Sequence, residues 1–115
     1  MTPLRSNPSR LNPLQLKTLA ILQALAGEPE FAEPPGEDGS VRVHSLPHAH
    51  GNHVHLGRAV VAMRDLTGLA NPSVLNALAR KGLLKGGPGG AYTLTGAGLD
   101  YDTGIAHQIL HGSDH

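Results

Sequence analysis

The chain contains no cysteine and no tryptophan, and aromatic residues make up only 3% of its 115 residues. Without thiols it can form neither a disulfide nor a thiolate metal site, and cysteine usage gives no indication of its redox compartment. A chain of this length builds one modest core, which here must consist of leucine, valine, isoleucine and alanine. Such a core is thin, and we expect the protein to gain further burial as a homodimer.

Long apolar runs are also absent. No stretch of the sequence approaches the ~20 apolar residues of a membrane-spanning helix. Residues 1–5 lack the apolar core of a signal peptide. These absences predict a cytoplasmic protein with no membrane partner.

Neither sign of charge is in excess, since nine Lys and Arg balance nine Asp and Glu. The distribution is uneven, because between residues 41 and 94 the only acid is Asp65. The basic residues of that stretch are Arg42, Arg58, Arg64, Arg80, Lys81 and Lys85. A basic body joined by acidic connectors is compatible with contacts to nucleic-acid phosphates.

Residues 65–94 read in order as helix, tight turn, second helix, strand, glycine hairpin and strand. The first helix is predicted from the apolar spacing of Leu56, Val60, Met63 and Leu66. Gly68, in the turn of residues 67–70, would supply the left-handed residue that commonly closes a helix.

The second helix is predicted to begin at Pro72, with Asn71 as its cap. Val74, Leu75 and Leu78 give it a buried face. Its exposed side comprises Ser73, Asn76, Ala77, Arg80 and Lys81, and Gly82 ends it.

Two strands are predicted around a glycine-rich tip at residues 86–90, one at residues 83–85 and one at residues 91–94. The β-branched alternation of residues 41–43 predicts a third short strand beside them.

These segments resemble the winged-helix DNA-binding domains of small bacterial regulators of the MarR and PadR types. The matching residues are 66–78, 81–84 and 92–98, and the most characteristic piece is the aromatic-x-Leu-Thr-x-x-Gly run that begins at Tyr92. The resemblance extends from about Leu14 to Asp102. It implies an α+β, mainly α fold: a winged helix-turn-helix with a small antiparallel wing sheet and flanking N- and C-terminal helices.

The function implied is that of a dimeric transcriptional regulator that binds double-stranded DNA. Ser73 and Asn76 would lie near base edges, and Arg80 and Lys81 near phosphates. Lys85 in the wing would contact the backbone or the minor groove, and Arg64 completes the set of candidate DNA-binding residues.

The predicted organisation is a flexible arm (residues 1–13), one domain (residues 14–111) and a tail (residues 112–115). The first helix of the domain runs from Leu14 to Ala26 and ends at Gly27. An acidic loop rich in proline and glycine follows at residues 28–40, and we interpret it as a solvated spacer. Thr95 would cap a last helix, which glycines divide into two short pieces, the second at residues 105–110.

Eight histidines are a large number for a chain of this size, and they cluster. Gly51 and Asn52 suit the centre of a two-residue hairpin turn. That turn would pair His50 with His53 and His48 with His55, so that four imidazoles project from one face. Alternatively, Asn52 caps a helix that begins at His53, which would scatter the imidazoles.

A converging set of imidazoles could bind Zn²⁺, Ni²⁺ or Cu²⁺. A second candidate pair is His107 and His111, whose spacing of four would place them on one face of a helix. The sequence thus leaves zinc or nickel as possible cofactors without requiring either.

Three functions remain open at this level: a DNA-binding regulator, a winged-helix module that binds protein, and a histidine-rich metal-binding protein. Catalysis is not expected, because the sequence contains no nucleophile elbow, no phosphate-binding loop and no histidine-glutamate zinc-protease signature.

Overall fold

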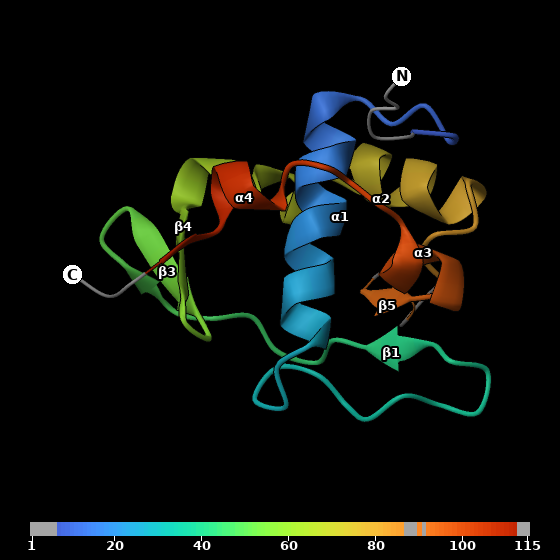
Figure 1. Cartoon of the computed structure of the whole chain (residues 1–115), viewed down its shortest axis with the longest axis horizontal. Coiled ribbons are helices and arrows are strands. Elements are labelled where there is room, and N and C mark those ends of the chain that lie inside the picture. The colour runs from blue at the N-terminus through green and yellow to red at the C-terminus, as the bar shows by residue number, and fades with distance from the viewer. Residues whose placement is uncertain (1–6, 87–89, 91, 113–115) are drawn as a thin grey trace, which may run out of the picture.

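The computed structural model describes residues 7–86, 90 and 92–112, and it confirms an α+β fold that is mainly helical. The long helix α1 (Pro13–Ala26) runs through the middle of the molecule, between two small groups of strands (Figure 1). The side chains of Leu19, Ile21, Leu22 and Leu25 on this helix are 0% exposed. The core therefore surrounds α1.

The sequence predicted α1 almost to the residue, because both of its ends carry strong local signals. The Asn12 side chain accepts a hydrogen bond from the Gln15 backbone N–H (2.8 Å), and the Gln15 side chain accepts one from the Asn12 N–H (3.1 Å). This reciprocal capping box fixes the start of the helix, and Gly27 ends it.

The N-terminal arm differs from the expectation over its last residues. Leu11 is 4% exposed, and the Ser9 N–H donates to the Tyr101 hydroxyl oxygen (3.2 Å). Residues 7–12 therefore contact the domain, and residues 1–6 lie outside the described part.

The helix predicted through Leu56 and Val60 is wrong. Strands β3 (His53–Leu56) and β4 (Ala59–Ala62) form an antiparallel hairpin there, with Leu56 opposite Ala59. Val54 and Leu56 are buried while His55 between them is exposed, so the pattern has the period of two typical of a strand. The β-branched run at Val60 favours the strand further.

Helix η1 (Met63–Ala70) follows β4 directly and is a 3-10 helix. The role predicted for Gly68 is wrong, because this residue does not adopt a left-handed conformation. Instead, η1 packs tightly against α1 there: a Cβ on Gly68 would lie 1.8 Å from the Thr18 hydroxyl oxygen. An ion pair between Lys17 of α1 and the buried Asp65 of η1 (3.0 Å) also connects the two helices.

Helix α2 (Pro72–Arg80) confirms the prediction at both ends. The Asn71 side chain accepts a hydrogen bond from the Ser73 N–H (3.0 Å), and Gly82 follows the helix with a φ of 78°. Ala77, which was expected on the exposed side, is buried, because it follows the buried Val74 by three residues and so shares its face.

The sheet on one side of α1 contains β1 (Val41–Arg42) and β5 (Thr93–Leu94), with Val41 opposite Leu94. Leu84 forms a single bridge to Leu94. The predicted three-strand arrangement is therefore present but shorter than expected, and the tip residues 87–89 and residue 91 lie outside the described part.

The sheet on the other side of α1 contains β2 (Ala49–His50), β3, β4 and β6 (His111–Gly112), in that order. The C-terminal segment reaches it through two short helices, α3 (Gly96–Asp100) and α4 (Ala106–Ile109). Thr95 caps the first of these, as predicted.

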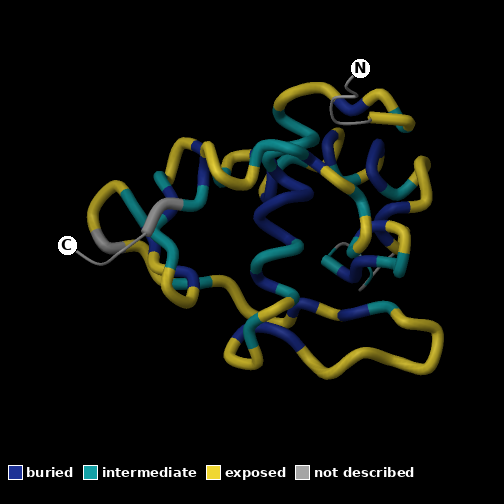
Figure 2. Tube along the Cα trace, in the orientation of Figure 1, coloured by how far each residue is buried: buried dark blue, intermediate teal, exposed yellow. Residues whose placement is uncertain are grey.

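The acidic loop of residues 28–40 is largely exposed (Figure 2). It is not a detached spacer, however, because Phe31 and Ala32 are buried and Ala32 bridges Val43. The loop is thereby held against β1.

Candidate nucleic-acid interface and apolar pocket

The exposed face of α2 carries a polar stripe formed by Ser73, Asn76 and Arg80, which are all exposed. Their spacings of three and four residues place them on one side of the helix. The opposite side, with Val74 and Leu78, packs into the core. In the described part of the chain, no ion pair involves Arg80.

The other predicted DNA-binding cations are only partly gathered around this stripe. Arg64 is exposed on η1. Lys81 is exposed beside Arg80, and its Nζ donates to the Ser9 carbonyl oxygen (2.5 Å). Lys85 Nζ forms an ion pair with Asp38 (2.8 Å), a residue of the acidic loop.

Two ion pairs tie the acidic loop to the sheet of β1 and β5. Arg42 pairs with Glu33 (2.8 Å), and Lys85 pairs with Asp38. Hydrogen bonds from Lys85, and then from Ser40, hold the pKa of the Asp38 carboxyl well below its usual range. Sequence reasoning missed Asp38 because the two partners lie far apart in the chain.

The aromatic-x-Leu-Thr-x-x-Gly run joins strand β5 to helices η1 and α2. The Tyr92 hydroxyl donates to the Leu69 carbonyl oxygen at the end of η1 (2.7 Å). The Thr95 hydroxyl donates to the Gly82 carbonyl oxygen (2.7 Å) just after α2 and accepts from the Gly98 N–H. A Cβ on Gly98 would lie 2.0 Å from the Leu83 carbonyl oxygen, so this position requires glycine.

The histidine hairpin is confirmed at the level of the backbone. His50 lies opposite His53 and Ala49 opposite Val54, and Gly51 has a φ of 71° in the turn. The rings of His53 and His55 meet edge to face, with their centroids 5.0 Å apart.

The four-imidazole face is only partly described, since the His50 side chain lies outside the described part. His48 is exposed and precedes β2. Among the described histidines and carboxylates, no group of three or more is arranged to hold a metal ion. The helical pair predicted at His107 and His111 is wrong, because α4 ends at Ile109 and His111 belongs to β6, opposite Val60.

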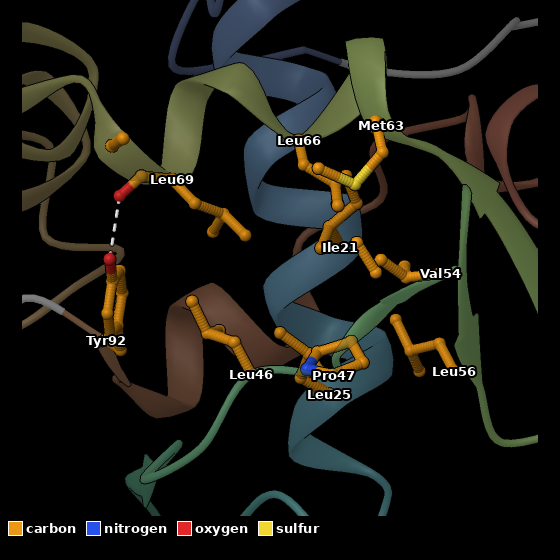
Figure 3. Close-up of a pocket in the computed structure, with 12 residues that line it drawn as sticks. Ile21, Leu25, Leu46, Pro47, Val54, Leu56, Met63, Leu66, Leu69 and Tyr92 are labelled. Atoms are coloured by element: carbon orange, nitrogen blue, oxygen red, sulfur yellow. Dashed lines mark hydrogen bonds between the residues drawn. The ribbon is translucent and has the colours of Figure 1, made fainter. Parts of the chain in front are cut away.

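An apolar pocket of about 230 Å³ lies between α1, the hairpin of β2 and β3, and η1 (Figure 3). Its walls are aliphatic side chains from three elements. They include Ile21 and Leu25 of α1, Val54 and Leu56 of β3, and Met63 and Leu66 of η1. No pattern in the sequence predicted this pocket, because the helix wrongly predicted through Leu56 and Val60 takes the place of strand β3, which forms one of its walls.

Leu46 and Tyr92 also line the pocket, and the remaining lining residues are Pro47, Ala49, Leu69 and Ala70. Leu46 and Met63 are 42% and 39% exposed, so each presents apolar surface to solvent as well as to the pocket. The Tyr92 hydroxyl is engaged by the Leu69 carbonyl, as the dashed line in Figure 3 shows.

Comparisons with protein-family models, with curated proteins and with solved structures returned no match for this chain. Within the described ranges, no helix has the length and apolar character that a membrane crossing requires.

Proposed function

We propose that the protein is a winged helix-turn-helix regulator that binds double-stranded DNA through α2. The observation that carries this proposal is the exposed stripe of Ser73, Asn76 and Arg80 on a helix whose other face is buried. A helix held in this way can enter the major groove without exposing the core.

The order of elements supports the proposal. Helix η1 leads into α2 through Asn71 alone, and β5 then returns to pair with β1. The hydrogen bonds of Tyr92 and Thr95 attach β5 and its neighbours to the ends of both helices. The hairpin of β3 and β4 lies between β1 and η1 as an addition to this order.

The stripe offers side chains of the kinds that read DNA. Asn76, in the middle of α2, suits the bidentate contact to adenine, and Ser73 can contact either base type. Arg80 and Lys81 at the end of α2 would neutralise phosphates, and as a homodimer the protein would present two such helices to one duplex.

Replacement of Arg80 tests the proposal. Arg80→Ala should weaken binding to duplex DNA of every sequence, and it should flatten the dependence of log affinity on log salt by about one unit. Asn76→Ala should instead relax the preference for particular bases. Both effects are measured by fluorescence anisotropy over a range of salt concentrations.

Arg58→Ala is the matched control. Arg58 is also an exposed arginine, and it lies in the turn between β3 and β4, a hairpin that is away from α2 in Figure 1. Its loss should leave the salt slope unchanged. Equal slopes for wild type, Arg80→Ala and Arg58→Ala would contradict the proposal.

A winged-helix module that binds protein is the second candidate, and the acidic loop favours it. Asp38 and Glu33 neutralise Lys85 and Arg42, which removes two cations from the wing side of the molecule. If duplex DNA at low salt fails to bind the folded wild-type protein, this alternative takes precedence.

A further inference from the structure

We infer that the apolar pocket between α1, the hairpin of β2 and β3, and η1 binds a small, uncharged ring compound larger than benzene. The pocket volume is about 230 Å³. An engineered apolar cavity of about 150 Å³ stays dry and accepts benzene, so this pocket has room for a bicyclic ring.

The chemistry of the lining selects an apolar ligand over water. A buried water needs about two to four polar partners. The polar side-chain group at the edge of the pocket, the Tyr92 hydroxyl, already donates to the Leu69 carbonyl. The other lining side chains are aliphatic or thioether, and the sulfur of Met63 is suited to contact the edge of an aromatic ring.

The rim of the pocket explains how a ligand would enter. Leu46 and Met63 are the large hydrophobic side chains that remain exposed in the described part of the chain, and both line this pocket. A ligand seated between them would bury apolar surface that is otherwise in contact with water, and this burial is the driving force for binding.

The pocket lies next to the elements that would hold DNA, and this step rests on the proposed function. Leu66, Leu69 and Ala70 of η1 line it, and the next residue, Asn71, caps α2. Tyr92, which directly precedes β5, also lines the pocket, and its hydroxyl donates a hydrogen bond to the Leu69 carbonyl oxygen. A ligand that moves η1 would therefore shift α2 and the wing strand together, and with them the affinity for DNA.

Indole is a suitable probe, because it is a neutral bicyclic ring. The melting temperature should rise with the logarithm of free indole, and the NMR signals of the Met63 methyl group and the Tyr92 ring should shift in a saturable manner. Free tryptophan carries the same ring system with two charges and should bind at least tenfold more weakly.

Ala49→Phe tests the location of the site. Ala49 is exposed on β2 and lines the pocket, so the added ring should occupy the space and reduce indole affinity at least tenfold. Ala106→Phe, at an exposed position on α4 outside the pocket, is the control and should change affinity less than twofold. Absence of saturable indole binding, or equal binding by wild type and Ala49→Phe, overturns the site.

Two further measurements separate this inference from the proposed function. Sedimentation of the wild type and of Ala49→Phe shows whether a second copy fills the pocket, since a dimer that dissociates on this substitution overturns the small-ligand assignment. DNA affinity is then measured with and without indole. A change in DNA affinity on addition of indole supports the coupling, whereas an unchanged DNA affinity overturns it. A protein that binds indole but no DNA overturns the DNA proposal alone.

Discussion

At the scale of single residues, Gly68 shows how a glycine can be required by packing rather than by backbone conformation. Its φ is not positive, yet any side chain there would meet the hydroxyl oxygen of Thr18 on α1. Thr18 is itself 1% exposed and donates to the Leu14 carbonyl oxygen (2.8 Å), so it has no free space into which it could move.

We therefore predict that Gly68→Ala lowers the free energy of unfolding by about 1–3 kcal/mol, the range typical of overpacking. Thr18→Ala removes the hydroxyl that the new methyl group would meet. The double variant should accordingly recover part of the loss, with an interaction energy above about 0.5 kcal/mol. Urea unfolding of the three variants measures both quantities.

Gly96→Ala provides the control for intrinsic helix propensity, because a Cβ at Gly96 meets no atom within 4 Å. This substitution should be neutral or stabilising, by up to about 1 kcal/mol. If Gly68→Ala is equally well tolerated, the close approach of η1 to α1 is not a constraint.

At the scale of elements, what the sequence predicted depended on whether the signals were local. Helix α1 was predicted closely from the spacing of its apolar residues and from Gly27, and α2 from its cap Asn71, which lies next to the residues that it caps. The helix predicted through Leu56 failed because apolar residues at helical spacing coincide with an alternating strand pattern. Only pairing with β4 and burial of Val54 decided between the two.

The residues of the candidate site also divide into those predicted from local patterns and those that depend on long-range contacts. The exposed stripe of Ser73, Asn76 and Arg80 followed from periodicity within one helix, and the structure exposes all three. The partner of Lys85 and the apolar pocket depend on contacts between distant segments, and no pattern in the sequence marks them.

The histidine hairpin supports a prediction about metal binding. Two imidazoles on one tetrahedral Zn²⁺, with metal–nitrogen distances of about 2.1 Å, have ring centroids about 5 Å apart. The rings of His53 and His55 are already 5.0 Å apart, and the register places His50 opposite His53. We expect Zn²⁺ or Ni²⁺ to raise the melting temperature at neutral pH, because an ion that binds the folded hairpin stabilises it.

Replacing both His53 and His55 with alanine should abolish the metal-dependent shift. His107→Ala should leave it intact, because that histidine is exposed on α4 and its expected partner His111 lies in a strand. Titration calorimetry with each ion provides the measurement, and tight binding that survives the loss of His53 and His55 would place the metal elsewhere.

At the scale of the whole molecule, the net charge is zero, but acidic and basic residues lie in different segments of the sequence. The fold brings some of these opposite charges together as ion pairs. The acidic loop folds back onto the sheet of β1 and β5, where Asp38 holds Lys85. Because the pKa of Asp38 is held below its ordinary value of about 3.9, this pair stabilises the folded state above that pH. The stabilisation is lost only as the pH falls through the lowered pKa, so the ion pair is present at neutral pH.

An acidic loop that pairs with Lys85 would compete with DNA phosphate for this cation. If α2 and the wing bind DNA, Asp38→Asn should free Lys85 and tighten binding several-fold at low salt, and the gain should shrink as salt screens the charges.

Glu37→Gln is the matched control, because Glu37 is an exposed acid of the same loop that forms no ion pair within the described residues. Both substitutions change the net charge by the same amount, so a general electrostatic effect would raise DNA affinity equally in the two variants. A larger gain for Asp38→Asn, measured by anisotropy with one duplex at low and at high salt, would identify Lys85 as a DNA contact that the loop masks. Equal gains would leave Lys85 as a partner of the loop alone and would restrict the DNA contact to α2.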